Sequence, residues 1–291
     1  MKRNNVIPAI LLAIGTCITP AGGAHAAAPP AGEGTLVIEA PATAIQADAP
    51  ADKPSSRPQT GQHAYTFKAQ LANGRATQLN YLLFVPASYG RDPQAKWPLL
   101  VFLHGSREVG RDVSRLRRAI LPQIVEENPE FPFIVVSPQS PTRQHGWYPS
   151  LDAIEALLDR LQAELAIDPD RIYLTGLSMG GYGAWALAMD APDRFAAIAP
   201  VVGGYFYSAR QLCALKDKPI WVFGARLDRN VPVRESERVV NALRSCGGNP
   251  RFTVFENADH DLGWELAYRT TELFEWLLQQ RRGQPPAQAS D

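Results

Sequence analysis

The sequence has no excess of charge of either sign, and histidine is scarce. Lysine plus arginine and aspartate plus glutamate number 29 each, so the formal net charge is zero. Nucleic acids and anionic membranes attract proteins with a basic excess, which this composition does not have. We therefore expect no nucleic-acid partner. The chain has only five histidines, so each can be assessed singly as a catalytic base.

The apolar run near the start, residues 6–18, is too short to span a bilayer comfortably. It follows Lys2 and Arg3 and precedes the small-x-small pattern Ala24-His25-Ala26, an arrangement typical of a secretory signal peptide. We predict a signal peptide over residues 1–26. Cleavage after Ala26 would export the chain to the periplasm or the medium of a bacterium, with no stable membrane insertion afterwards. The alternative is a retained membrane anchor.

Cysteine is as scarce as methionine, with three residues of each. Cys17 would leave with the signal peptide, so Cys213 and Cys246 would remain as an even pair in an oxidising compartment. They form either a disulfide or two buried free thiols. The sequence does not fix the Cβ geometry that decides between these alternatives.

Large apolar residues are sparse from residue 27 to residue 61, where alanine and proline are frequent, so we expect a flexible linker there. From residue 62 to residue 282 strand and helix patterns alternate, and residues 283–291 are expected to be a disordered tail. The alternation predicts one α/β domain with a doubly wound, mostly parallel sheet and helices on both faces. The expected strands are residues 63–69, 78–85, 98–103, 133–137, 171–175, 196–202, 219–223 and 251–255. The expected helices are a segment capped by Ser150 and running to about 165, then 181–189, 233–244 and 264–282.

The sequence Gly176-Leu177-Ser178-Met179-Gly180 lies between an expected strand and an expected helix. A sharp turn of this kind holds a serine in a strained conformation and leaves room only for glycine at positions 176 and 180. It also places Ser178 at a helix N-terminus, which favours developing negative charge. We predict that Ser178 is a nucleophile. The alternative is a tight turn with an incidental serine.

A serine nucleophile needs a general base, and His260 is the only histidine that follows Ser178. We expect His260 in an exposed loop after the last strand, at the carboxyl edge of the sheet; the alternative is a solvent-facing loop histidine. The acid should lie between the two and beyond the end of a strand, as Asp228 does. Glu256 is the main competitor of Asp228.

The loop Leu103-His104-Gly105-Ser106 follows the first buried strand. We expect an oxyanion hole formed by the backbone N–H of Met179 and one N–H of this loop, from Ser106 or else Gly105. His104 is expected to brace the loop by hydrogen bonds.

Aromatic residues follow two of the strands at the same edge of the sheet. We predict that Trp147, Tyr148 and Tyr205 bind substrate by stacking on an aromatic or sugar acyl group. The alternative is that these rings cover the core beneath a loop.

These motifs together resemble the α/β-hydrolase superfamily over about residues 62–282. Within it the chain is similar to exported feruloyl and acetylxylan esterases, polyhydroxybutyrate depolymerases and dienelactone-hydrolase-like peptidases. The stretch from Asp170 to Gly181 carries the resemblance most specifically. The resemblance implies hydrolysis of a small-molecule or polysaccharide-linked carboxylic ester, without a metal or other cofactor.

The chain departs from the pattern of these relatives at three places. Asp228 follows Gly224-Ala225-Arg226-Leu227 rather than His-Gly-x-x, and the loop after Ser106 begins Arg107-Glu108-Val109-Gly110 rather than Gly-Glu-Arg-Gly. Asp259 stands where a glycine is common, and a carboxylate turned toward the base would raise its pKa. The competing activities are a prolyl-oligopeptidase-like peptidase and an acyltransferase. A further alternative is a non-catalytic binding protein on a hydrolase scaffold, which loss of Ser178, Asp228 or His260 would have favoured; none of the three is missing.

Overall fold

The computed structural model describes residues 58–71 and 73–284, all of which belong to one compact unit. The predicted signal peptide, most of the predicted linker and residues 285–291 lie outside the described residues. Gly61, which was expected to end the linker, is the first residue of strand β1. The domain boundaries otherwise stay a prediction.

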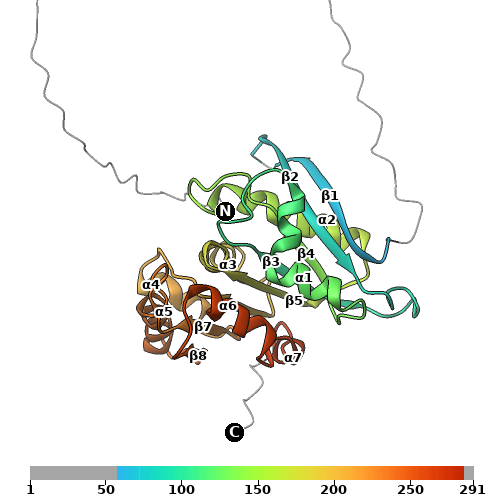
Figure 1. The fold of residues 1–291 in the computed structure, drawn as a ribbon. Coiled ribbons are helices and arrows are strands. Elements are labelled where there is room, and N and C mark those ends of the chain that lie inside the picture. The colour runs from blue at the N-terminus through green and yellow to red at the C-terminus, as the bar shows by residue number, and fades with distance from the viewer. Residues whose placement is uncertain (1–57, 72, 285–291) are drawn as a thin grey trace, which may run out of the picture. The chain divides into compact units, whose positions relative to one another are not determined.

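The described residues form one eight-stranded sheet in the order β1-β2-β4-β3-β5-β6-β7-β8 (Figure 1). β1 and β2 form an antiparallel hairpin, β2 is antiparallel to β4, and all later neighbours are parallel. The mostly parallel sheet predicted from the sequence is thereby confirmed. The strands are β1 (Gly61–Gln70), β2 (Ala76–Val85), β3 (Trp97–Leu103), β4 (Ile134–Pro138), β5 (Ile167–Leu177), β6 (Ala197–Val201), β7 (Trp221–Ala225) and β8 (Arg251–Phe255).

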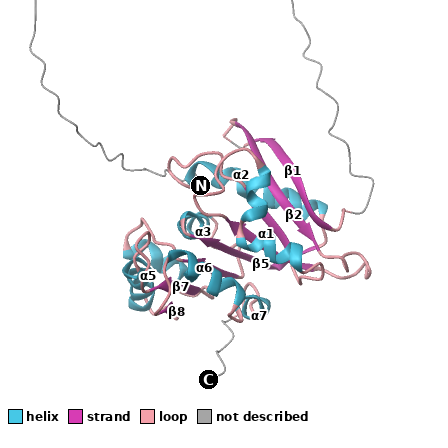
Figure 2. Ribbon diagram, viewed as in Figure 1, coloured by secondary structure: helices cyan, strands magenta, loops and turns pink. Residues whose placement is uncertain are grey.

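Both faces of the sheet are covered, because successive side chains of a strand point to opposite faces. In β3, Leu99, Val101 and Leu103 join one apolar cluster, while Leu100 and Phe102 join the other. Helices α2, α3, α4 and α5 supply residues to the first cluster, and α1, α6 and α7 supply the second. Figure 2 shows helices on both faces of the sheet. The helices are α1 (Ile120–Glu127), α2 (Leu151–Glu164), α3 (Met179–Asp190), α4 (Ala209–Leu212), α5 (Val233–Ser245), α6 (His260–Arg269) and α7 (Leu273–Leu278).

The last predicted helix was wrong, because residues 264–282 do not form one continuous segment. α6 ends at Arg269, and α7 begins at Leu273. Thr271 stands between them, and its hydroxyl accepts a hydrogen bond from the N–H of Leu273 at 3.3 Å. Threonine offers the backbone such a partner outside the helical ladder, which favours a break at this position. Ser150 does precede α2, but its side chain makes no capping hydrogen bond.

Cys213 and Cys246 form a disulfide, which settles the alternative that the sequence left open. The bond ties the short 3₁₀ helix η3 (Cys213–Leu215) to the residue that caps α5. No helix among residues 58–71 and 73–284 is long and apolar enough to cross a membrane.

Candidate active site

Ser178 lies in the turn between β5 and α3, at the carboxyl edge of the sheet. Its backbone dihedral angles are φ 54° and ψ −117°, a positive-φ conformation that L-residues rarely adopt. A Cβ at position 180 would overlap the backbone carbonyl of Leu103, and one at position 176 would overlap that of Gly180. The two glycines thus allow β5 and α3 to approach β3 closely, and the close approach holds the serine in its strained conformation.

His260 connects Ser178 to Asp228. Nε2 of His260 lies 2.9 Å from the Ser178 hydroxyl, and Nδ1 lies 2.6 Å from Oδ2 of Asp228. The other carboxylate oxygen of Asp228 accepts the N–H groups of Asn230 and Val231, each at 2.8 Å. The Asp228 side chain is fully buried, and that of His260 is 12% exposed. The carboxylate is therefore fixed by its own loop and presents one oxygen to the imidazole.

His260 does not lie in an exposed loop, as the sequence analysis expected. It is the first residue of α6, and Asp259 caps that helix by accepting the N–H of Leu262 at 3.0 Å. The Asp259 carboxylate is thus engaged by the helix N-terminus. Glu256 is also turned to another partner, since Arg226 donates to it and lowers its pKa.

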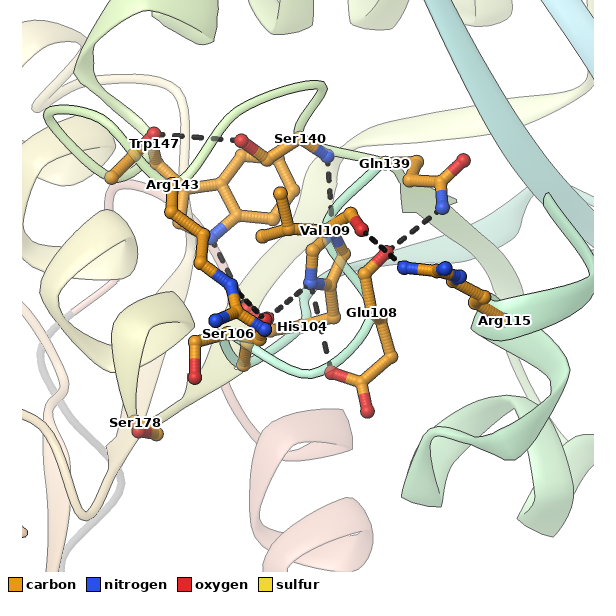
Figure 3. Close-up of polar contacts among 12 residues, drawn as sticks. His104, Ser106, Glu108, Val109, Arg115, Gln139, Ser140, Arg143, Trp147 and Ser178 are labelled. Carbon is orange, nitrogen blue, oxygen red and sulfur yellow. Dashed lines mark hydrogen bonds and ion pairs between the residues drawn. The ribbon is translucent and has the colours of Figure 1, made fainter. Parts of the chain in front are cut away.

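His104 braces the loop after β3 from a fully buried position (Figure 3). The N–H of Ser140 donates to its Nε2 at 3.0 Å, so Nε2 is unprotonated and Nδ1 carries the proton, which it donates to the carbonyl of Gly105 at 2.5 Å. Burial lowers the pKa of His104 to about 4, so the ring is neutral near pH 7. The bracing role predicted for this histidine is confirmed.

Gly105 and Ser106 line the same cleft as Ser178, and Met179 follows the serine in the chain. Arg143 donates to the carbonyl of Ser106 at 3.0 Å, which fixes the peptide plane on that side (Figure 3). In the part of the chain that the structure describes, the N–H groups of Ser106 and Met179 donate to no protein acceptor. Both are therefore available to a ligand.

Comparison with known proteins identifies the family. The Esterase family model matches residues 75–255, more than half of the chain. The chain belongs to the esterase family. A solved thermostable esterase is 34% identical with a TM-score of 0.64, over 76% of this chain and 63% of that one. The chain thus spans less than two thirds of that esterase.

Two further relatives of this esterase-family chain are informative. Poly(3-hydroxyalkanoate) depolymerase C of Paucimonas lemoignei is 38% identical over 60 residues, which cover 21% of this chain and 14% of the depolymerase. A solved ferulic acid esterase, 16% identical with a TM-score of 0.56, covers 75% of this chain and 99% of its own length. At that identity it shows the fold alone, which is that of the α/β-hydrolases.

The aromatic residues predicted to bind substrate lie elsewhere in this esterase-family chain. Trp147 is buried against Gly183, and its Nε1 donates to the carbonyl of His104 at 3.2 Å. Tyr205 is also buried, and Tyr148 packs against Tyr207. None of the three predicted residues lines the cleft at Ser178. Trp147 and Tyr205 instead cover the core, as in the alternative interpretation of these aromatic residues.

The cleft at Ser178 has a volume of about 770 Å³, within the range of small-molecule sites. Its walls include residues that the sequence analysis did not identify as site residues, among them Arg115 and Arg118 of the 3₁₀ helix η1 (Val113–Arg118). Across the cleft, Arg107 donates to both carboxylate oxygens of Asp261 at 2.8 and 3.0 Å. The frequency of arginine in residues 113–118 was the only signal in the sequence that could have pointed to Arg115 and Arg118. The pattern of this segment predicts neither a strand nor a long helix. No group of three or more histidine, cysteine, aspartate or glutamate residues suited to a metal occurs among the described residues.

Proposed function

We propose that this chain hydrolyses carboxylic esters through an acyl-enzyme formed on Ser178. The observation that carries the proposal is the unbroken line of hydrogen bonds from Asp228 through His260 to Ser178 at the wall of an open cleft. Nucleophile, base and orienting acid each lie within hydrogen-bonding distance of the next, as this chemistry requires. Membership of the esterase family supports the same reaction.

In the first step Nε2 of His260 takes the hydroxyl proton while the oxygen of Ser178 attacks the ester carbonyl. His260 then returns the proton to the leaving alcohol, and the acyl group remains on the serine. Water repeats the sequence and releases the acid. Asp228 keeps the proton of the neutral imidazole on Nδ1 and stabilises the imidazolium that forms.

The tetrahedral intermediate carries a negative oxygen, which needs hydrogen-bond donors. The unpartnered N–H groups of Ser106 and Met179 would supply them, and removing one such donor typically costs about 3 kcal/mol. The buried His104 and the Arg143 contact hold the Ser106 peptide in place before substrate arrives.

A panel of substrates tests the reaction class. We expect turnover of p-nitrophenyl and feruloyl esters and none of peptide amides, with turnover lost in Ser178→Ala. Faster cleavage of amides than of esters would favour the peptidase alternative. Transfer of the acyl group to an added alcohol in preference to water would favour the acyltransferase.

We also propose that the chain is exported. The support is the signal-peptide pattern of residues 1–26 together with the disulfide between Cys213 and Cys246, a bond that persists in oxidising compartments. An exported esterase would meet small esters or polymeric esters outside the cytoplasm.

A further inference from the structure

Two arginines enter the active-site cleft from the same face of one helix. η1 is a 3₁₀ helix, with three residues per turn, so side chains at i and i+3 lie in line. Arg115 and Arg118 have this spacing, and both line the cleft that contains Ser178. Arg117 projects elsewhere, donating to Glu126 at 2.8 Å and to the carbonyl of Gln62 at 3.2 Å. The helix thus presents two of its three arginines to the site.

These two arginines have no carboxylate partner. Among the described residues, no acidic oxygen lies within 4.0 Å of a side-chain nitrogen of Arg115 or Arg118. Arg115 donates to the carbonyl of Val109 at 3.1 Å, which is a neutral acceptor (Figure 3). Asp112 caps the start of η1, where it accepts the N–H of Ser114. The pKa of its carboxyl is lowered first by the hydrogen bonds with Ser114 and also by the charges of Arg115 and Arg118, although neither arginine forms an ion pair with it.

The acidic residues of the cleft do not cancel this charge. Asp261 is paired with Arg107, so that pair contributes no net charge. Glu108 lies 3.8 Å from Nδ1 of His104, and burial raises the pKa of its carboxyl. Three arginines and two acids line the cleft, so an excess of positive charge remains there.

Apolar residues accompany this charge. Ala119, Ile120 and Leu177 line the same cleft, and the first two follow directly after Arg118. A substrate that suits these walls has a short apolar body and an anionic group at a distance from the reacting carbonyl. A guanidinium binds a carboxylate through two parallel hydrogen bonds, which makes arginine suited to this task.

We propose that the preferred substrate is an ester that carries a free carboxylate, held by Arg118 with help from Arg115. The substrate class is thus a half-ester of a dicarboxylic acid, or an ester whose alcohol part bears a carboxylate. This inference rests on the proposed ester hydrolysis and adds to it the charge of the substrate.

The test compares matched esters on the full-length protein. Mono-p-nitrophenyl adipate and p-nitrophenyl hexanoate differ by a terminal carboxylate on the acyl chain. The butyrate ester of 3-hydroxybutyrate and sec-butyl butyrate place the same difference on the alcohol part. The quantity of interest is the ratio of kcat/KM for the anionic ester to kcat/KM for the neutral ester. The pair with the higher ratio shows which part carries the carboxylate.

We expect Arg118→Gln to lower this ratio about fivefold and Arg118→Glu to lower it further, because a well-oriented charge pair between exposed groups contributes up to a factor of about this size. Arg117→Gln is the matched control: it removes an equal charge from the same helix, on the side away from the cleft, and should leave the ratio within twofold of wild type. Raising the salt concentration should lower the wild-type ratio, because salt screens an exposed charge pair.

A ratio that is the same in wild type, Arg118→Gln and Arg118→Glu would overturn the inference, and so would an equal fall in Arg117→Gln. The two proposals fail in different ways. If wild type hydrolyses neither member of either pair, ester hydrolysis itself is wrong. If wild type hydrolyses both members of a pair and the Arg118 variants have the same ratio of kcat/KM, only the inferred carboxylate is wrong.

Discussion

Ser178 holds a backbone conformation, φ 54° and ψ −117°, that costs a side-chain-bearing residue roughly 1–3 kcal/mol. The hydrogen bond from its N–H to the carbonyl of Val201 at 3.0 Å helps to hold the turn in place. The positive φ places the hydroxyl where His260 can reach it. The site thus stores strain at the one residue whose oxygen must be exposed to substrate.

The strain at Ser178 predicts a difference in stability between two variants of this residue. Ser178→Gly should be more stable than Ser178→Ala by about 1 kcal/mol, because glycine adopts positive φ without a Cβ penalty. Chemical denaturation of the two inactive variants measures the difference. At Ala242, inside helix α5, the order should reverse, and Ala242→Gly should be less stable than the native alanine. Equal stability of the two Ser178 variants would mean that the turn is not strained.

The buried His104 leads to a prediction about how the stability of the fold depends on pH. Its pKa is about 4 in the folded chain and near 6.5 when unfolded, so between these values the unfolded chain binds a proton that the folded chain does not. Stability should therefore fall as the pH drops, by roughly 2–3 kcal/mol between pH 7 and pH 4.5. Denaturant titrations at the two pH values measure the loss. It should be smaller in His104→Gln, which keeps an acceptor for the Ser140 N–H.

Parallel losses in wild type and His104→Gln would show that other groups cause the acid sensitivity. If the variant does not fold, the imidazole signals of His104 in the wild type give the same answer by NMR. The chemical shifts of the His104 ring should change with pH with a midpoint near pH 4. A midpoint near 6.5 would contradict the buried, neutral ring.

Among the elements, the disulfide joins η3 to the end of α5 across a separation of 33 residues. A crosslink over a loop of this length typically stabilises by about 2–4 kcal/mol. Reductant should lower the free energy of unfolding of the wild type by that amount and leave a Cys213→Ser/Cys246→Ser double variant unaffected. No change in the wild type would show that the bond contributes nothing to stability.

The strands and the nucleophile turn could be predicted from the sequence because their signals are local. β3 is a continuous apolar run, and Gly176 and Gly180 flank Ser178 at the spacing that a tight turn requires. The break between α6 and α7 was missed because Thr271 ends a helix only through its particular hydrogen bond. The roles of Trp147 and the cleft arginines depend on packing between distant segments, which no local pattern records.

At the scale of the whole molecule, the candidate site is built from loops after β3, β5 and β7 and from the helix after β8. These strands are parallel, so their carboxyl ends meet at one edge of the sheet. The order Ser178, Asp228, His260 along the chain follows from that arrangement. The fold therefore explains why residues 82 positions apart in sequence meet at 2.9 Å.

Export is also a property of the whole chain. Expressed in a bacterium with its first 26 residues, the protein should be recovered outside the cytoplasm with Ala27 as its first residue. N-terminal sequencing of the purified protein gives the answer. Recovery from the membrane fraction with residues 1–26 intact would favour the retained anchor.

The central claim is that Ser178 is an activated nucleophile, and covalent labelling with a fluorophosphonate tests it most directly. The account predicts that the folded wild-type protein gains one label, that peptide mass spectrometry places it on Ser178, and that Ser178→Ala gains none. Folded protein that stays unlabelled, or that carries the label on another residue, would contradict the account.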